Sequence, residues 1–436
     1  MSNEDSQKNN HKIAVIGLGF VGLPLSVMLA DKGFHVIGID KDQRKINQLQ
    51  SFKSYIGDID DHRLEKVMSE GNFFPTYDFD EIKNVHSIII CVPTPLTKQK
   101  TPDLRFIISA GNEVQKRLQK GQLVILESST YPGTTNEVLL PILEKSGFHV
   151  GTDFFLANSP ERIDPGNTKY SVEEIPKVIG GVTEKCLDVG VTLYKEIYQD
   201  VVPVSSTEAA ELTKLLENTF RFINISFINE MAILCEKLKV DIWEIVDAAA
   251  TKPYGYTPFY PGPGIGGHCI PVDPFYLQWK LQQLEASSDF ITISDVTNQS
   301  MVNHIVSRTR ELLKPTKPLA SANILIYGIT YKKDVSDTRD SSALEIMEKF
   351  HREGANVLYH DPFVSSILIH DHLYTNIPLT EKTLNEMDCV IILTDHSEIP
   401  LDTILANSQL VFDTRNVTKG HHGNAKVVRL GEAIKD

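Results

Sequence analysis

The sequence has no surplus of basic residues, few cysteines and no long apolar run. Lysine and arginine number 43 against 57 aspartates and glutamates, which gives a formal net charge of −14. Such a charge argues against a surface that binds nucleic acid or anionic membranes in general. The apolar runs fall short of the roughly 18 residues that a membrane-spanning helix needs. The spacing of the five cysteines fits neither a disulfide framework nor a zinc site, so we expect no bound metal.

The rest of the composition is that of an ordinary globular protein. Hydrophobic residues make up 41% of the 436 residues and charged residues 23%. A chain of this length exceeds a single hydrophobic core, so we predict three parts: 1–204, 205–314 and 315–436. Residues 1–11 are polar and lack the apolar core of a signal peptide. We therefore expect a soluble, cytoplasmic protein.

The first part opens with a dinucleotide-binding fingerprint. A predicted strand at 12–16 runs into Gly17-Leu-Gly19-Phe-Val-Gly22, and a helical stretch and a second strand at 35–39 follow. The first glycine makes the tight turn, the second lets the pyrophosphate approach the backbone, and the third allows close packing of helix on strand. The turn also brings the phosphates to a helix N-terminus, which attracts anions.

Asp40 ends the second strand of this fingerprint. A carboxylate here binds the ribose hydroxyls of NAD and repels the 2′-phosphate of NADP, although the nearby Arg44 and Lys45 leave NADP open. We predict NAD as the cofactor. The predicted cofactor contacts in this part are Gly17, Gly19, Phe20, Val21, Gly22, Asp40, Arg44, Thr94 and Thr130.

Predicted strands and helical stretches then alternate, which is typical of a doubly wound parallel sheet. Ligands bind beyond the carboxyl ends of the strands in such sheets. Three polar residues follow predicted strands at 87–92, 123–127 and 153–157: Thr94, Thr130 and Glu161. We expect all three to face the cofactor. For any one of them, a turn-forming role explains its place equally well.

Residues 207–239 contain neither glycine nor proline and carry apolar residues on more than one helical face. A helix of this length is roughly 50 Å long, more than one small domain covers. We expect it to connect domains and to be covered partly by a second copy of the chain. Lys214 and Asn218 lie on one face of this helix. They either belong to a solvated face or point into a site, where they would stabilise a developing oxyanion.

Residues 260–274 hold four glycines and four prolines around a single thiol, Cys269. Proline fixes φ and glycine permits positive φ, so this run is predicted to be a rigid, irregular loop. Such a loop is costly to order and is usually functional when it carries a nucleophile. A buried structural thiol is the alternative, because that is the commoner state of a free cysteine. A second helix, predicted at 289–313, completes the central part.

The last part repeats the strand–helix order without a glycine fingerprint, so we predict a second α/β sheet. Lys332, Lys333 and Arg339 follow a predicted strand at 323–327 and precede a predicted helix start at 341–342. Positive charge beside a helix N-terminus suits a nucleotide diphosphate other than the NAD. A salt-bridged surface loop is the alternative for each of these residues.

With these parts assembled, the chain resembles the nucleotide-sugar 6-dehydrogenases, the UDP-glucose/UDP-N-acetylhexosamine dehydrogenase family. The resemblance runs from about Lys12 to Thr418. It implies two Rossmann-like domains joined by a long helix, with the UDP-sugar bound by the last domain, and a homodimer or larger homo-oligomer. It also implies a four-electron oxidation, in which the C6 alcohol of the sugar becomes a carboxylate and NAD is reduced twice.

The resemblance assigns roles to individual residues. The run Gly266-Gly-His-Cys269-Ile-Pro-Val-Asp273 matches the motif GGxCxPxD, which makes Cys269 the implied nucleophile and Asp273 its paired carboxylate. Lys214 and Asn218 match oxyanion-side donors, and Thr130 and Glu161 match positions that handle water and protons. Arg339 matches a cofactor-side arginine. The implied substrate contacts are Glu161, Arg162, Lys214, Asn218, Tyr260, Gly266, Lys332 and Arg415.

Two departures from the motif indicate the sugar. Val272 stands where UDP-glucose enzymes typically carry a lysine, and residues 159–166 resemble the N-acetylhexosamine branch. UDP-N-acetylglucosamine is favoured over UDP-N-acetylmannosamine, and UDP-glucose is a further alternative. Two readings from other classes stay open: a single-step NAD-dependent alcohol or hydroxy-acid dehydrogenase, and a non-catalytic sensor of nucleotide sugars.

Overall fold

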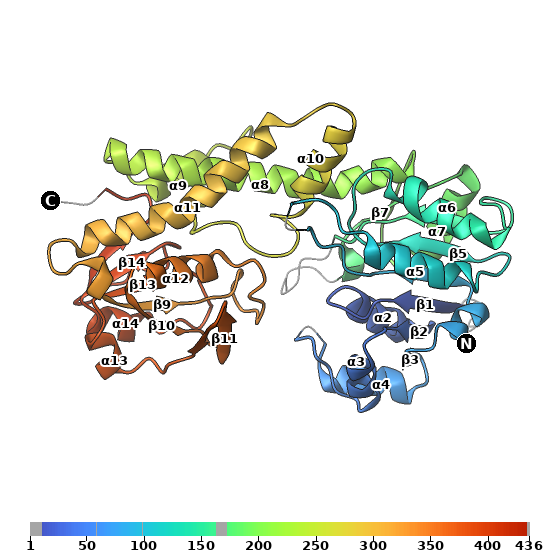
Figure 1. Ribbon diagram of the computed structural model, residues 1–436, viewed down its shortest axis with the longest axis horizontal. Coiled ribbons are helices and arrows are strands. Elements are labelled where there is room, and N and C mark those ends of the chain that lie inside the picture. Colours follow the sequence, from blue (N-terminus) through green and yellow to red (C-terminus); the bar gives the residue numbers. More distant parts are fainter. Residues whose placement is uncertain (1–10, 58, 98, 163–171, 434–436) are drawn as a thin grey trace. The chain divides into compact units, whose positions relative to one another are not determined.

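The computed structural model describes residues 11–433 except 58, 98 and 163–171. The chain divides into two compact units, the first made of 1–217 and 275–287 and the second of 218–274 and 288–436. Each unit contains a largely parallel sheet with helices around it, drawn from blue to teal and from orange to red in Figure 1. This confirms the predicted fold class. The division into three parts stays a prediction.

The first unit is built on an eight-stranded sheet of order β3-β2-β1-β4-β5-β6-β7-β8. From β1 the strand order proceeds outward in both directions, so it reverses between β1 and β4. Ligands bind at such a reversal in open α/β sheets. The strands are β1 Lys12–Ile16, β2 His35–Ile39, β3 Phe73–Thr76, β4 Ser87–Ile90, β5 Leu123–Leu126, β6 Phe155–Asn158, β7 Lys177–Gly181 and β8 Val201–Val204. The sheet departs from the predicted parallel order where β6 and β7 pair antiparallel.

Helices and short turns connect these strands. They are α2 Gly22–Asp31, α3 Gln43–Gln50, α4 Asp61–Ser69, η1 Phe79–Asn84, α5 Arg105–Gln115, η2 Thr135–Leu139, α6 Leu140–Leu143, η3 Glu144–Ser146, η4 Val172–Glu174 and α7 Glu184–Lys195. Two further helices, α8 Thr207–Leu238 and α10 Asp273–Gln283, have residues in both units.

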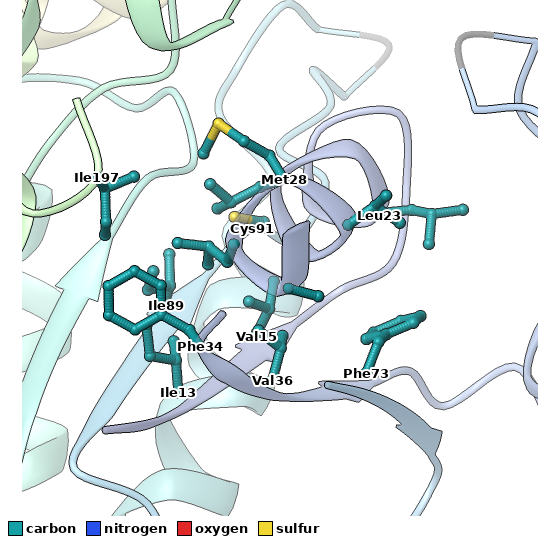
Figure 2. Close-up of a cluster of buried hydrophobic side chains, with 14 of the residues drawn as sticks. Ile13, Val15, Leu23, Met28, Phe34, Val36, Phe73, Ile89, Cys91 and Ile197 are labelled. Atoms are coloured by element: carbon teal, nitrogen blue, oxygen red, sulfur yellow. The ribbon is translucent and has the colours of Figure 1, made fainter. Parts of the chain in front are cut away.

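Strand β1 shows why this sheet is buried on both faces. Ile13 and Val15 belong to one buried cluster and Ala14 and Ile16 to another, because successive side chains of a strand point to opposite faces. Figure 2 shows part of the first cluster, which contains both Met28 of α2 and Val15 of β1. A sheet covered on both faces in this way is typical of parallel α/β folds.

The second unit contains a five-stranded parallel sheet of order β10-β9-β13-β14-β15 and a two-stranded antiparallel sheet. The strands are β9 Asn323–Tyr327, β10 Asn356–His360, β11 Ser366–Ile369, β12 His372–Thr375, β13 Cys389–Ile392, β14 Leu410–Asp413 and β15 Lys426–Arg429. The helices are α9 Ile242–Ala250, α11 Asp289–Leu313, η5 Leu319–Ser321, α12 Ser342–Arg352, α13 Glu381–Asn385 and α14 Leu401–Asn407.

The two sheets begin with the same turn, although the second has no glycine fingerprint. After β1, the Gly17 N–H donates to Ile39 O at 2.8 Å; after β9, the Gly328 N–H donates to His360 O at 2.9 Å. Both glycines have positive φ, +96° and +79°. The residue after each glycine donates its N–H to an aspartate that ends the next strand, Asp40 or Asp361. The predicted second Rossmann-like sheet is therefore present.

The long helix was predicted at 207–239, and α8 spans Thr207–Leu238. Its large exposed apolar side chains recur at helical spacing: Leu212, Leu216, Phe220, Phe227, Leu234 and Leu238. That a second copy of the chain covers part of this helix stays a prediction. Among the residues that the structure describes, no helix is long and apolar enough to cross a bilayer.

Candidate active site

In the fingerprint turn of the first unit, two glycines are required by packing within the protein, whereas the third leaves space for a ligand. A Cβ on Gly22 would lie 1.9 Å from Gly17 O, and a Cβ on Gly17 would lie 2.6 Å from Cys91 O. Neither position accepts a side chain. A Cβ on Gly19 would meet no described atom within 4 Å. Open space above the second glycine is what a pyrophosphate at this turn requires, so the turn fits the predicted cofactor.

Asp40 holds this turn together at the end of β2. Its Oδ2 accepts the Leu18 N–H at 3.0 Å, its Oδ1 accepts the Asp42 N–H at 2.9 Å, and Lys45 Nζ lies 3.2 Å from Oδ2. Arg44 is paired with Asp42 instead, at 2.9 Å, and its side chain is 92% exposed. The predicted preference for NAD over NADP thus depends on an ordered carboxylate.

The other predicted cofactor residues border the same turn or follow neighbouring strands. Phe20 is exposed beside Val21, which is half-buried. Thr94 is buried, and its carbonyl oxygen accepts a hydrogen bond from the hydroxyl of Tyr276 on α10. Thr130 is buried too, and its Oγ1 has no hydrogen-bond partner among the described residues. A buried hydroxyl in this state is available to a ligand or to water.

Glu161 lies in a network that the sequence did not suggest. Its Oε2 accepts a hydrogen bond from Lys177 Nζ at 2.9 Å, and its main-chain oxygen accepts one from Lys214 Nζ. Lys177 Nζ also lies 3.1 Å from Glu127 Oε2. Next along the chain, Arg162 pairs with Glu217 at 2.6 Å. Glu127 and Lys177 are the residues that motif reasoning missed.

On α8 the two predicted donors are both buried. Lys214 binds the Glu161 carbonyl, and Asn218 Nδ2 donates to Asp273 Oδ2 at 2.6 Å. Arg221, one turn further on, is exposed. The polar face of the helix therefore turns from the interior to solvent after Asn218. The alternative of a solvated face is therefore wrong for Lys214 and Asn218, and that they point into a site stays a prediction.

The cysteine loop is irregular over 260–272, as predicted, but its last two residues are helical because α10 begins at Asp273. The reason is a turn in which the Asp273 N–H donates to Cys269 O at 2.8 Å. Cys269 is exposed, whereas Cys91, Cys186, Cys235 and Cys389 are buried. The alternative of a buried structural thiol at Cys269 is therefore excluded.

The glycines of this loop allow the last sheet's loops to approach it closely. A Cβ on Gly266 would lie 2.7 Å from Asp340 O, and a Cβ on Gly262 would lie 2.7 Å from Arg415 Nη1. Gly267 has φ +92°, and a Cβ there would lie 2.8 Å from the Tyr331 ring. These contacts bring Gly266 and Gly267 beside 331–341 and Gly262 beside Arg415, all within the second unit.

The remaining predicted residues of the second unit have identified surroundings. Arg339 pairs with Asp337 at 2.6 Å, and this hydrogen bond is the first cause of its raised pKa, to which Tyr331 and Cys269 also contribute. Arg415 Nε donates to Leu393 O at 2.9 Å. Lys332 is half-buried, and Ser341 caps α12 by accepting the Ala343 N–H. Tyr260 stacks on Trp243 with ring centroids 5.9 Å apart.

The predicted site residues thus form two groups, each held inside one unit. The first contains the fingerprint turn, Asp40, Thr94, Thr130, Glu161, Arg162 and Lys214. The second contains Asn218, Tyr260, Gly266, Cys269, Asp273, Lys332, Arg339 and Arg415. The first group can hold a dinucleotide. The second offers an exposed thiol, a buried carboxylate and a set of cations.

Sequence profiles of one family match most of the chain. The NAD binding domain of the UDP-glucose/GDP-mannose dehydrogenase family matches residues 11–200, its central domain matches 208–300 and its UDP binding domain matches 325–420. The matched segments correspond to the glycine fingerprint, to the long helix with the cysteine loop, and to the second sheet.

Individual relatives agree with these profiles. The chain is 36% identical to the UDP-N-acetyl-D-glucosamine 6-dehydrogenase of Pseudomonas aeruginosa, over 89% of this chain and 91% of that protein. It is 33% identical to the UDP-N-acetyl-D-mannosamine dehydrogenase of Pyrococcus horikoshii, over 94% and 96%. The solved structure of the Pyrococcus horikoshii UDP-D-ManNAc dehydrogenase matches with a TM-score of 0.87 and 32% identity, over 96% of this chain and 99% of that one. The chain therefore belongs to the UDP-glucose/GDP-mannose dehydrogenase family and is an NAD-dependent oxidoreductase.

Proposed function

We propose that the chain oxidises the C6 hydroxyl of a UDP-N-acetylhexosamine to a carboxylate, in two NAD-dependent steps, through a covalent intermediate on Cys269. The observation that carries this proposal is the exposure of the Cys269 thiol on a glycine- and proline-rich loop, four residues before a buried aspartate. That aspartate, Asp273, is oriented by Asn218 at 2.6 Å. An exposed thiol on a loop whose backbone is hydrogen-bonded to the start of α10 suits nucleophilic catalysis.

The residues have the following proposed roles. Bound NAD accepts a hydride from the sugar in each oxidation. The Cys269 thiolate attacks the C6 aldehyde to give a thiohemiacetal, and the second oxidation converts this to a thioester that water hydrolyses. Lys214 and Asn218 donate hydrogen bonds to the oxyanions that develop at C6. Thr130, Glu161 and Asp273 position the water and move protons.

The second sheet is proposed to bind the UDP part. Arg415 carries positive charge beside Gly262 of the cysteine loop, and Lys332 follows Tyr331, whose ring lies against Gly267. Ser341 caps helix α12, whose N-terminus favours a diphosphate. Tyr260 stands at the start of the same loop and is 47% exposed. Arg339 is proposed to face the cofactor, and Arg162 to support the substrate side of Glu161.

UDP-N-acetylglucosamine is the proposed sugar, with UDP-N-acetylmannosamine and UDP-glucose as alternatives. Val272 in place of the lysine of UDP-glucose enzymes supports an N-acetylhexosamine. The similar proteins include dehydrogenases named for each N-acetyl sugar, at 36% and 33% identity, so they do not choose between the epimers. We further propose a homodimer or larger homo-oligomer, covered along the exposed apolar row of α8.

The proposal is tested by the stoichiometry of NADH. Each nucleotide sugar is made limiting in turn, and NADH formed per sugar consumed is measured with excess NAD. We expect about two NADH per UDP-N-acetylglucosamine, because an alcohol reaches the acid by two hydride transfers. About one NADH per sugar would instead establish a single-step alcohol dehydrogenase. No NADH from any of the three sugars, with NAD still bound, would favour a sensor.

A further inference from the structure

A buried lysine lies between two buried carboxylates, one of which, Glu161, is proposed to handle water and protons. Lys177 is the first residue of β7, Glu127 follows β5, and Glu161 follows β6. These three strands are neighbours in the first sheet. The side chains of Lys177, Glu127 and Glu161 are 3%, 0% and 7% exposed. A lysine this deeply buried is rare unless it is paired.

The antiparallel pairing of β6 and β7 creates this arrangement. Asn158 of β6 lies opposite Gly180 of β7. Because the pairing is antiparallel, counting three residues forward from Asn158 and three back from Gly180 places Glu161 opposite Lys177. In a fully parallel sheet the first residue of β7 would lie at the other edge, far from the carboxyl ends of β5 and β6. The single reversed pair thus brings a cation to the edge where the site residues lie.

The charges and hydrogen bonds around Lys177 indicate that it orients the Glu161 carboxylate. Burial raises the pKa of Glu127 to about 7, and the charge of Glu161 adds to this while Lys177 opposes it. Although burial lowers it, the pKa of Lys177 is held well above its ordinary value by Glu127 and Glu161. Tyr194 donates a hydrogen bond to Glu127 Oε1, whereas Lys177 makes its hydrogen bond to Glu161 Oε2. Both carboxylates therefore hold the charge on Lys177, and the hydrogen bond of its ammonium group goes to Glu161.

The main chain at Glu161 connects this cluster to the proposed oxyanion donor. Lys214 Nζ donates to Glu161 O, and the Arg162 N–H donates to Glu161 Oε1 at 2.6 Å. Arg162 also pairs with Glu217, which stands one helical turn from Lys214 on α8. Glu161 is thus held by Lys177 through its side chain and by Lys214 of α8 through its main chain.

We propose that Lys177 is a positioning residue, which fixes the Glu161 carboxylate and, through the Glu161 main chain, the ammonium group of Lys214. Glu127 supplies the counter-charge that allows Lys177 to stay buried. The consequence for turnover rests on the proposed function above, whereas the consequence for Lys214 does not. Buried ion pairs often add little net stability, so a purely structural role explains the cluster less well.

The variants are chosen to remove the cation without leaving two unpaired buried carboxylates. Lys177→Met combined with Glu127→Gln removes one positive and one negative charge and keeps the side-chain volumes similar. Lys120→Met is the matched control, because Lys120 is 71% exposed and pairs with Asp153 in the same unit. Circular dichroism and NAD titration show which variants are folded.

Two measurements are made on the full chain. The first is the rate at which limiting acetic anhydride acetylates Lys214, quantified by peptide mass spectrometry, and it needs no substrate. We expect acetylation to be several-fold faster in the double variant and unchanged in the control. The second is steady-state turnover, for which we expect kcat to fall about tenfold or more with the KM for NAD unchanged, because a misplaced group costs rate rather than cofactor binding.

Unchanged Lys214 acetylation together with unchanged kcat in the folded double variant would overturn the inference. If the wild-type chain oxidises none of the sugars, the proposed function fails, and Lys214 acetylation alone decides the role of Lys177. If the double variant does not fold, Lys177→Arg takes its place. A guanidinium keeps the charge but cannot occupy the ammonium position between both carboxylates, so faster acetylation is again expected, and wild-type behaviour would refute the role.

Discussion

Cys269 differs from the other four cysteines of the chain in being exposed. Burial raises the pKa of the Cys91 and Cys389 thiols, Cys389 to about 12, which keeps both in the unreactive thiol form. The local sequence around Cys269 already separated it from them, because glycines and prolines surround no other cysteine so densely. The proposed site around it depends on tertiary contacts, since Asp273 is oriented by a residue more than fifty positions away in sequence.

The first prediction at the residue scale concerns this thiol. Cys269→Ser is expected to lower steady-state NADH formation by at least about 100-fold, because a hydroxyl is a far weaker nucleophile toward the aldehyde. The matched control is Cys235→Ala, which removes a buried thiol of the same unit and is expected to keep turnover. Both are checked by steady-state kinetics and thermal unfolding. Wild-type kcat in Cys269→Ser would refute the covalent route.

The polar residues of α8 show where residue-scale prediction stops. Lys214, Asn218 and Arg221 share one helical face by spacing alone, yet Lys214 and Asn218 are buried and Arg221 is exposed. Periodicity gives the direction of a side chain around the helix axis. It does not say where the covering elements end, because those come from other parts of the chain.

At the scale of elements, the fingerprint turn offers a paired prediction. Gly22→Ala places a Cβ 1.9 Å from Gly17 O and is expected to destabilise the first unit, whereas Gly19→Ala meets no described atom within 4 Å. Overpacking of this kind typically costs about 1–3 kcal/mol or more. Gly19→Ala should therefore unfold at the wild-type temperature but bind NAD at least about tenfold more weakly, because its Cβ blocks the pyrophosphate.

Thermal unfolding and calorimetric NAD titration separate these two effects. Unaltered NAD affinity in Gly19→Ala would mean that the cofactor does not pass over the second glycine. Unaltered thermal stability in Gly22→Ala would mean that helix α2 can move away from the turn without cost.

Strands at the sheet edges are the elements that the sequence did not reveal. β3 contains Pro75 and β8 contains Pro203, and both lie at the ends of the first sheet. Proline removes a ladder hydrogen bond and so argues against a strand, but an edge strand has one side without a partner strand and tolerates it. The rule that proline argues against a strand holds for central strands. It fails for β3 and β8 because their position at the edge of the sheet is decided by the tertiary structure.

At the scale of the whole molecule, two buried carboxyls make stability depend on pH. Burial raises the pKa of Glu211 to about 7, although Gly133 and Thr135 N–H groups donate to its oxygens. Burial also raises the pKa of Glu127 to about 7. A carboxyl whose pKa is higher in the folded chain stabilises the fold below its ordinary pKa and loses this contribution as pH rises through 7.

The unfolding temperature of the first unit is therefore expected to decrease as pH rises from about 5 to about 7 and to level off above that. Glu211→Gln cannot ionise, so it should flatten this fall, by at most about 3 kcal/mol of unfolding free energy. Glu144→Gln, an exposed residue of the same unit, is the control. Calorimetry at a series of pH values makes the comparison, and an equally steep fall in Glu211→Gln would show that other groups cause it.

The sequence by itself determined the features that depend on neighbours along the chain. The fingerprint turn, helix α8 and helix α11, predicted at 289–313 and found at Asp289–Leu313, follow from periodicity and from glycine and proline chemistry within a few residues. The irregular cysteine loop follows from the same rules. The tertiary structure decided the rest: the reversed β6–β7 pair, the burial of Lys177 between Glu127 and Glu161, and the contact of Asn218 with Asp273. These depend on which distant segments meet, and local patterns carry no information about that.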